Sequence, residues 1–69
     1  MKRLTISEFR ELPFGTNIIV HIDMPYLTRD ETYNAVIVRD IIYYEDGKVD
    51  ERHTIEEYMF DELATVYLR

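Results

Sequence analysis

The pattern of hydrophobic and polar positions along the chain predicts mainly short β-strands. From Asn17 to Asp23, Ile18, Val20 and Ile22 would share one face of a strand and Ile19 and His21 the other, and from Ala64 to Arg69 the inward residues would be Ala64, Val66 and Leu68. A period of two is typical of a strand with one buried face. Met24 to Asp30 contains a proline and ends in polar residues, which favours a loop. Alternation in the strands and a period near 3.6 in the helices predict a core made of Phe9, Ile18, Val20, Ile22, Ile37, Met59, Val66 and Leu68.

A longer β segment is predicted from Glu31 to Glu45, because this stretch is dense in Val, Ile and Tyr. Arg39 and Asp40 interrupt its alternation, and a bulge or a sharp bend at this point would explain the interruption. The dipeptide Asp46-Gly47 then predicts a two-residue type I′ hairpin. That turn would set Glu45 opposite Lys48, Tyr44 opposite Val49, Ile42 opposite Glu51 and Asp40 opposite His53. The polar segment from Val49 to Thr54 would return as an edge strand.

Two short helices are predicted from N-terminal capping patterns. Thr5 and Glu8 have the spacing of a capping box, and Pro13 limits the helix that follows. Thr54 and Glu57 have the same spacing and predict a second helix, which would continue to about Leu63 with Ile55, Met59 and Leu63 on its inner face. Pro13 to Thr16 is expected to form a turn.

The order of elements predicts an α+β fold in one domain that spans residues 1–69. A twisted antiparallel sheet or SH3-like barrel of four to five strands with two short helices would fit this order, and a flatter sheet with both helices on one face is the alternative. A chain of 69 residues without cysteine cannot be stabilised by disulfides or thiolate–zinc sites. It therefore depends on a well-packed core or on a partner that covers apolar surface.

Charge is distributed unevenly along the chain. Asp40 to Glu62 holds nine carboxylates against Lys48 and Arg52, a local net charge of −7, while the other residues sum to +1 and the whole chain to −6. Such a field attracts basic surfaces and repels nucleic acid and anionic membranes. No apolar run approaches the length of a membrane span, and the N-terminus does not look like a signal peptide. We therefore expect a cytoplasmic protein that binds neither nucleic acid nor membrane.

Catalytic and metal-binding patterns are weak. The only histidines are His21 and His53, and they lack the spacing of a zinc site. The carboxylate pairs fall on a short exposed helix, where burial cannot drive their pKa values apart as acid–base catalysis requires. Gly15 and Gly47, the only glycines, have turn roles, which leaves no phosphate-binding loop. The sequence therefore predicts no enzyme activity, no metal and no cofactor.

Protein–protein interaction is the function that the sequence favours. Tyrosine is enriched at interfaces, and Tyr43 and Tyr44 must point to opposite faces of a strand. We expect an acidic surface with tyrosine anchors that binds a basic surface of a partner protein, such as one that binds nucleic acid. The expected partner-binding residues are Tyr44, Glu45, Asp46, Asp50, Glu51, Glu56, Glu57, Tyr58, Asp61 and Glu62.

In composition, though not in any motif, the chain resembles small acidic inhibitor proteins of phages and mobile elements, including nucleic-acid mimics. That resemblance implies an inhibitor that blocks its partner. The alternative is an SH3-like accessory subunit that stabilises a larger complex through an apolar interface, with the acidic residues facing solvent. The oligomeric state is left open by the sequence.

Overall fold

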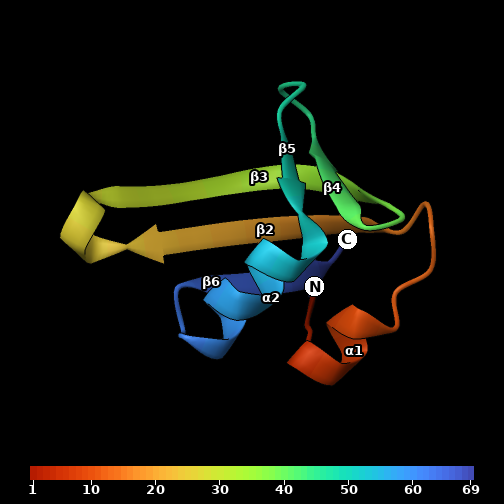
Figure 1. Cartoon of the computed structure of the whole chain (residues 1–69), viewed down its shortest axis with the longest axis horizontal. Helices are drawn as coiled ribbons and strands as arrows, with labels where there is room; N and C mark the ends of the chain where they lie inside the picture. The colour runs from red at the N-terminus through yellow and green to blue at the C-terminus, as the bar shows by residue number, and fades with distance from the viewer.

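Six antiparallel strands form one open sheet in the order β1-β6-β2-β3-β4-β5 (Figure 1). The computed structural model describes residues 1–69. Its elements are β1 (Lys2–Arg3), α1 (Ile6–Arg10), β2 (Asn17–Met24), the 3₁₀ turn η1 (Pro25–Leu27), β3 (Arg29–Val38), β4 (Ile41–Tyr44), β5 (Val49–Glu51), α2 (Arg52–Phe60) and β6 (Ala64–Leu68).

The prediction of an α+β fold is confirmed, but the SH3-like barrel is wrong. A barrel requires its first and last strands to pair, and here the sheet ends at β1 on one side and β5 on the other. These edge strands are only two and three residues long. The strand that follows α2, β6, pairs with β1 and β2 and not with β5, so the sheet stays open. The alternative of a flatter sheet with both helices on one side describes the structure better.

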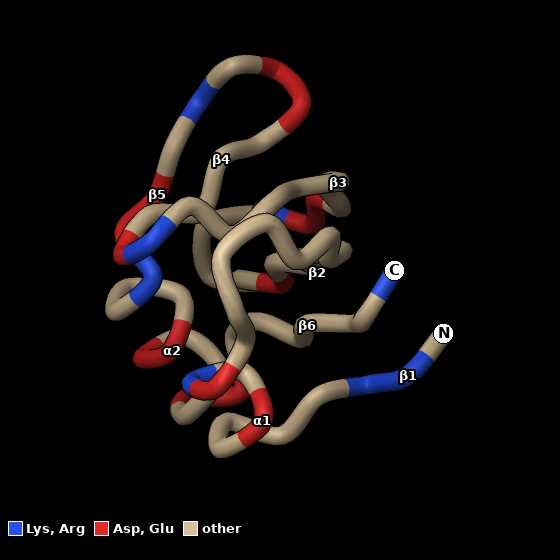
Figure 2. Tube along the Cα trace, turned by 90° about the vertical axis from the view of Figure 1, so that its right-hand side faces the viewer, with Lys and Arg blue, Asp and Glu red and all other residues tan.

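Both helices lie against the same face of the sheet, which we call the inner face (Figure 2). Phe9 of α1 and Ile55 of α2 are fully buried there against Ile18, Val20 and Ile22 of β2. The thirteen buried residues are Leu4, Phe9, Ile18, Val20, Ile22, Met24, Ala35, Ile37, Ile42, Tyr44, Ile55, Ala64 and Val66. Six of the eight predicted core residues are among them. Met59 is only partly buried, and Leu68 is 38% exposed because it pairs with the short edge strand β1.

The first helix begins as the sequence predicts. The Thr5 hydroxyl accepts a hydrogen bond from the Glu8 N–H, and the Glu8 carboxylate accepts one from the Thr5 N–H. Leu4 and Phe9 on either side of this cap are buried. The predicted capping box of Thr54 and Glu57 at the start of the second helix is wrong. α2 begins at Arg52 with Glu51 as N-cap, so Thr54 lies inside the helix and caps nothing.

The predicted long β segment is two strands rather than one bent strand. The chain reverses at Arg39-Asp40, and Val38 at the end of β3 pairs with Ile41 at the start of β4. Arg39 has φ 56°, the left-handed conformation that non-glycine residues seldom adopt. The predicted loop from Met24 is also shorter than expected, because Met24 is the last residue of β2 and β3 already begins at Arg29.

The hairpin turns at Asp46-Gly47 as predicted, but its register differs by one residue. Gly47 has φ 88° and Asp46 does not have a positive φ, whereas a type I′ turn needs positive φ at both central residues. Tyr43 pairs with Val49, and the Tyr44 N–H donates to the Lys48 carbonyl. The loop is therefore longer by one residue. A shift of one residue moves each side chain to the opposite face, so the expected pairs Tyr44–Val49 and Asp40–His53 do not form.

Candidate functional site

The ten residues expected to bind a partner do not share one surface. The β4–β5 hairpin projects away from the helices, and α2 lies near α1 at the other end of the molecule (Figure 2). Glu45 and Asp46 are exposed at the hairpin. Glu56, Glu57, Asp61 and Glu62 belong to α2 or the turn after it. The structure thus divides the acidic stretch into a hairpin group and a helix group.

Acidic residues of the hairpin have local structural roles. The Asp46 carboxylate accepts a hydrogen bond from the Lys48 N–H at 2.9 Å, which closes the turn. The Glu45 carboxylate accepts one from the Asn34 side-chain amide at 3.3 Å. Glu51 is the N-cap residue of α2 and pairs with Ile41 across the sheet. A carboxylate at this position also interacts favourably with the positive end of the helix dipole.

Tyr44 is buried and cannot act as a surface anchor. It lies on the inner face, only 4% exposed, with its ring 5.0 Å from that of Tyr33. Its hydroxyl donates a hydrogen bond of 2.8 Å to Asp50. Burial, followed by the effect of the Asp50 carboxylate, raises the pKa of Tyr44 far above its ordinary range. The phenol therefore stays protonated and holds Asp50 against the core.

The helix group surrounds a hollow between α1 and α2. This hollow has a volume of about 300 Å³ and is lined by Ile6, Arg10, His53, Glu56, Glu57, Phe60 and Asp61. Arg10 of α1 forms an ion pair with Glu56 of α2. The His53 ring nitrogen lies 2.9 Å from the Glu57 carboxylate, one helical turn away. Asp61 and Glu62 form no ion pair, so their charge is not compensated locally.

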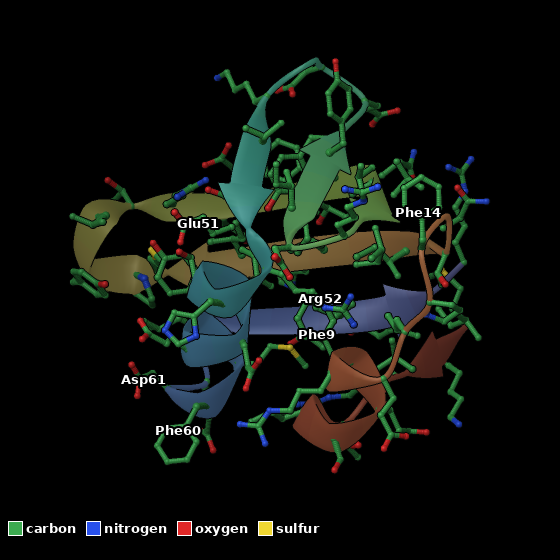
Figure 3. The ribbon with its side chains drawn as sticks, turned by 45° about the vertical axis from the view of Figure 1, so that its right-hand side comes forward. Phe9, Phe14, Glu51, Arg52, Phe60 and Asp61 are labelled. Atoms are coloured by element: carbon green, nitrogen blue, oxygen red, sulfur yellow. The ribbon has the colours of Figure 1, made fainter.

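Phe60 is the residue of this hollow that the sequence interpretation missed. Its side chain is 78% exposed at the end of α2, next to Asp61 (Figure 3). The partly buried hydrophobic residues that α2 packs against the core are Tyr58 and Met59, so Tyr58 is not a free anchor either. The helical period could have found Phe60, because it lies five residues after Ile55, which places it away from the buried side of the helix.

Arg52 was expected only to offset some of the acidic charge, but it joins the two helices. Its guanidinium lies over the Phe9 ring (Figure 3). One of its nitrogens donates to the carbonyls of Phe9, Arg10 and Leu12 at 2.5, 2.9 and 3.0 Å. Phe9 and Arg10 form the last turn of α1 and Leu12 follows it, in a region where a helix leaves carbonyls without partners in its own hydrogen-bond ladder. Arg52 thereby fixes one wall of the hollow.

Acid–base or metal chemistry gains no support from this geometry. No three side chains among the histidines, aspartates and glutamates converge as a metal site would require. His21 contacts Asp30 at 2.6 Å on the sheet, far along the chain from the second pair, His53 and Glu57. What the helix group offers is an acidic hollow with an exposed aromatic ring, which suits binding of a cationic surface.

No helix is long and apolar enough to cross a membrane. Comparisons with protein-family models, with curated proteins and with solved structures gave no match for this chain.

Proposed function

We propose that this protein binds a basic surface of a partner protein through the helix group and thereby blocks that surface. The observation that carries the proposal is the exposure of Phe60 within a group of carboxylates, namely Glu56, Glu57 and Asp61. An aromatic side chain surrounded by charge is typical of an interface with a central anchor and a polar rim. The ring supplies contact area, and the carboxylates supply orientation and fast association.

The carboxylates of the helix group differ in whether a neighbouring positive charge compensates them. Glu56 is compensated by Arg10. Glu57 contacts only the His53 ring, at 2.9 Å, and has no lysine or arginine partner. Asp61 and Glu62 face solvent. Of the carboxylates that line the hollow with Phe60, only Glu57 and Asp61 have no arginine or lysine partner, so these two carry most of the attraction that a cationic partner would feel there.

A partner that normally holds nucleic acid is the natural target, because such proteins present basic grooves. A protein with net charge −6 would compete with nucleic acid for that groove. The action would then be inhibition by occupancy, without chemistry.

The test begins with capture of partners from a bacterial lysate at low salt, followed by titration of the captured protein at about 50 and 500 mM salt, where screening of surface charge differs strongly. We expect Phe60→Ala to weaken binding at both salts by roughly tenfold or more, as for an interface anchor. Glu57→Lys with Asp61→Lys should weaken it mainly at low salt.

The matched control is Glu45→Lys with Asp46→Lys. It changes the net charge by the same amount on exposed residues of the β4–β5 hairpin, which projects away from α1 and α2 (Figure 2). If the control weakens binding as much as the helix variant does, net charge alone acts and the helix group is not the site. Circular dichroism confirms that each variant is folded.

The second candidate, an accessory subunit with an apolar interface, is favoured by a different surface. The sheet face opposite the helices carries exposed Ile41, Tyr43 and Val49. Binding through that face would persist at high salt, and Tyr43→Asp would abolish it while the Glu57 and Asp61 reversals would not.

A further inference from the structure

One side of α2 borders the hollow between the two helices and is only partly covered by α1. His53, Glu57 and Asp61 follow one another at intervals of four residues. Glu56 and Phe60 have the same spacing, so the five side chains share one side of the helix and its C-cap. All five line the hollow, and Phe60 remains 78% exposed (Figure 3). This side of α2 is therefore free to contact another molecule.

Negative charge remains in the hollow after its internal ion pair is counted. Arg10 is the only lysine or arginine that lines the hollow, and its guanidinium pairs with Glu56. Glu57 and Asp61 have no such partner. Three carboxylates therefore face one arginine, with His53 counted as neutral. The hollow attracts a further cation, and it still keeps a negative charge when one such cation has entered.

We propose that an arginine side chain of the partner protein occupies this hollow, with its guanidinium between the carboxylates of Glu57 and Asp61 and its flat face against the Phe60 ring. The inference rests on the proposed function, because it specifies the group that the helix group binds. A guanidinium has five N–H donors in one plane, so it donates to carboxylates at its edge while its face contacts an aromatic ring. A hollow of about 300 Å³ is at the small end of ligand sites, which suits a single side chain.

Arginine suits this hollow better than lysine does. An ammonium is a compact and strongly hydrated charge without a flat face, so it contacts a ring and two carboxylates at once less well. The chain itself contains the kind of contact that we propose. The Arg52 guanidinium lies over the Phe9 ring and at the same time donates to the carbonyls of Phe9 and Leu12. The hollow offers the same combination, with carboxylates in place of the carbonyls.

Two peptides test the preference for arginine directly. Each has blocked ends and a single charged residue flanked by glycines, which is arginine in one peptide and lysine in the other, so net charge and length are matched. The wild-type protein is titrated at about 20 mM salt, where surface charges are weakly screened, and the NMR signals of the Phe60 ring and the Glu57 N–H report binding. We expect a Kd in the low millimolar range for the arginine peptide. The lysine peptide should bind roughly fivefold more weakly or worse.

Two exposed side chains of the hollow are then changed in turn. Phe60→Leu keeps an apolar side chain but removes the aromatic face, so it should weaken binding of the arginine peptide by about threefold or more and reduce its advantage over the lysine peptide. Glu57→Gln removes one carboxylate with little change of shape and should weaken binding of both peptides. The matched control is Glu45→Gln, which removes an exposed carboxylate from the β4–β5 hairpin and should leave both affinities unchanged. Circular dichroism confirms that each variant is folded.

Failure of the arginine inference is distinguishable from failure of the proposed function. Equal affinity for the two peptides, or an arginine affinity that Phe60→Leu leaves unchanged, would overturn the arginine inference alone, provided that Phe60→Ala still weakens binding of the captured partner. If that partner binds Phe60→Ala as tightly as wild type, both fail.

The captured partner gives the final comparison. Replacing the arginines of its basic surface with lysines keeps the charge and should weaken the complex by about tenfold or more, because the planar contact with Phe60 and the two carboxylates is lost. An unchanged affinity would overturn the arginine inference while leaving the acidic docking surface in place.

Discussion

The guanidinium of Arg52 lies 5.4 Å from the centre of the Phe9 ring and donates a hydrogen bond to the Phe9 carbonyl. Arg52 is the first residue of α2, and Phe9 is the buried residue of the five-residue helix α1. A helix of five residues is too short to be stable alone. Its position therefore depends on Leu4, Phe9 and this arginine, and so does the hollow that α1 shares with α2.

Removal of the Arg52 guanidinium should destabilise the protein. We expect Arg52→Met to lower the free energy of unfolding by about 2–3 kcal/mol, because charge-assisted hydrogen bonds to three carbonyls are lost while the aliphatic stem remains. Arg52→Lys should recover only part of this loss, since one ammonium cannot match the planar guanidinium. Urea unfolding measures the difference. Equal stability of Arg52→Met and wild type would show that the carbonyls are satisfied by water.

Glu62→Gly should stabilise the protein by about 0.5–1 kcal/mol, because Glu62 has a left-handed conformation that glycine adopts more easily. Glu62 has φ 60°, its N–H donates to the Met59 carbonyl, and the Leu63 N–H donates to the Tyr58 carbonyl, which is the Schellman arrangement at the end of α2. Thermal unfolding measures the gain. The control Glu62→Ala removes the same charge without relieving the backbone and should give no such gain.

Gly47→Ala should cost about 1 kcal/mol, because φ is 88° at this position and a side chain disfavours that conformation. A Cβ atom added at Gly47 would meet nothing within 4 Å, so the cost is backbone strain and not a clash. Gly47→Asn should cost less, since asparagine tolerates positive φ. If alanine and asparagine prove equally neutral in urea unfolding, the turn must have a different conformation.

Glu8 should give the protein a weak dependence of stability on acidity. The Lys2 ammonium and then the Thr5 N–H hold the pKa of Glu8 at about 2, below its ordinary value. A carboxyl with a lowered pKa stabilises the fold above its unfolded pKa, and this contribution is lost as pH falls towards the folded value. Glu8→Gln keeps the cap but loses the ion pair with Lys2. The Glu8→Gln variant should therefore be less stable than wild type at pH 7. Its free energy of unfolding should converge on the wild-type value near pH 2.

The matched control for this titration is Glu11→Gln, an exposed carboxylate with no ion pair. Direct NMR titration of the Glu8 carboxyl provides an independent reading. A pKa in the ordinary range for Glu8 would contradict the expected pH dependence. High salt should reduce the effect, because both Lys2 and Glu8 are largely accessible to solvent.

Local contacts explain which elements the sequence determined. The Thr5–Glu8 cap spans three residues, and its hydrogen bonds form within one turn. In the strand from Asn17, every second residue from Ile18 is apolar, and Ile18, Val20 and Ile22 are fully buried. Gly47 adopts a positive φ and so forms the turn, whatever the register of the strand that follows. In each case the physical cause lies within a few neighbouring residues, so the pattern alone identifies it.

Tertiary contacts decided the rest. The reversal at Arg39-Asp40 exists because Ile37 pairs with Ile42 and both are buried in the sheet. Arg52 starts α2 earlier than the cap at Thr54 would, since its guanidinium meets carbonyls more than forty residues away in sequence. The acidic residues between Asp40 and Glu62 lie close together along the chain. They form two separate groups because the hairpin and α2 leave the sheet in different directions. Which charges share a surface depends on distances between elements, and a sequence pattern records only distances along the chain.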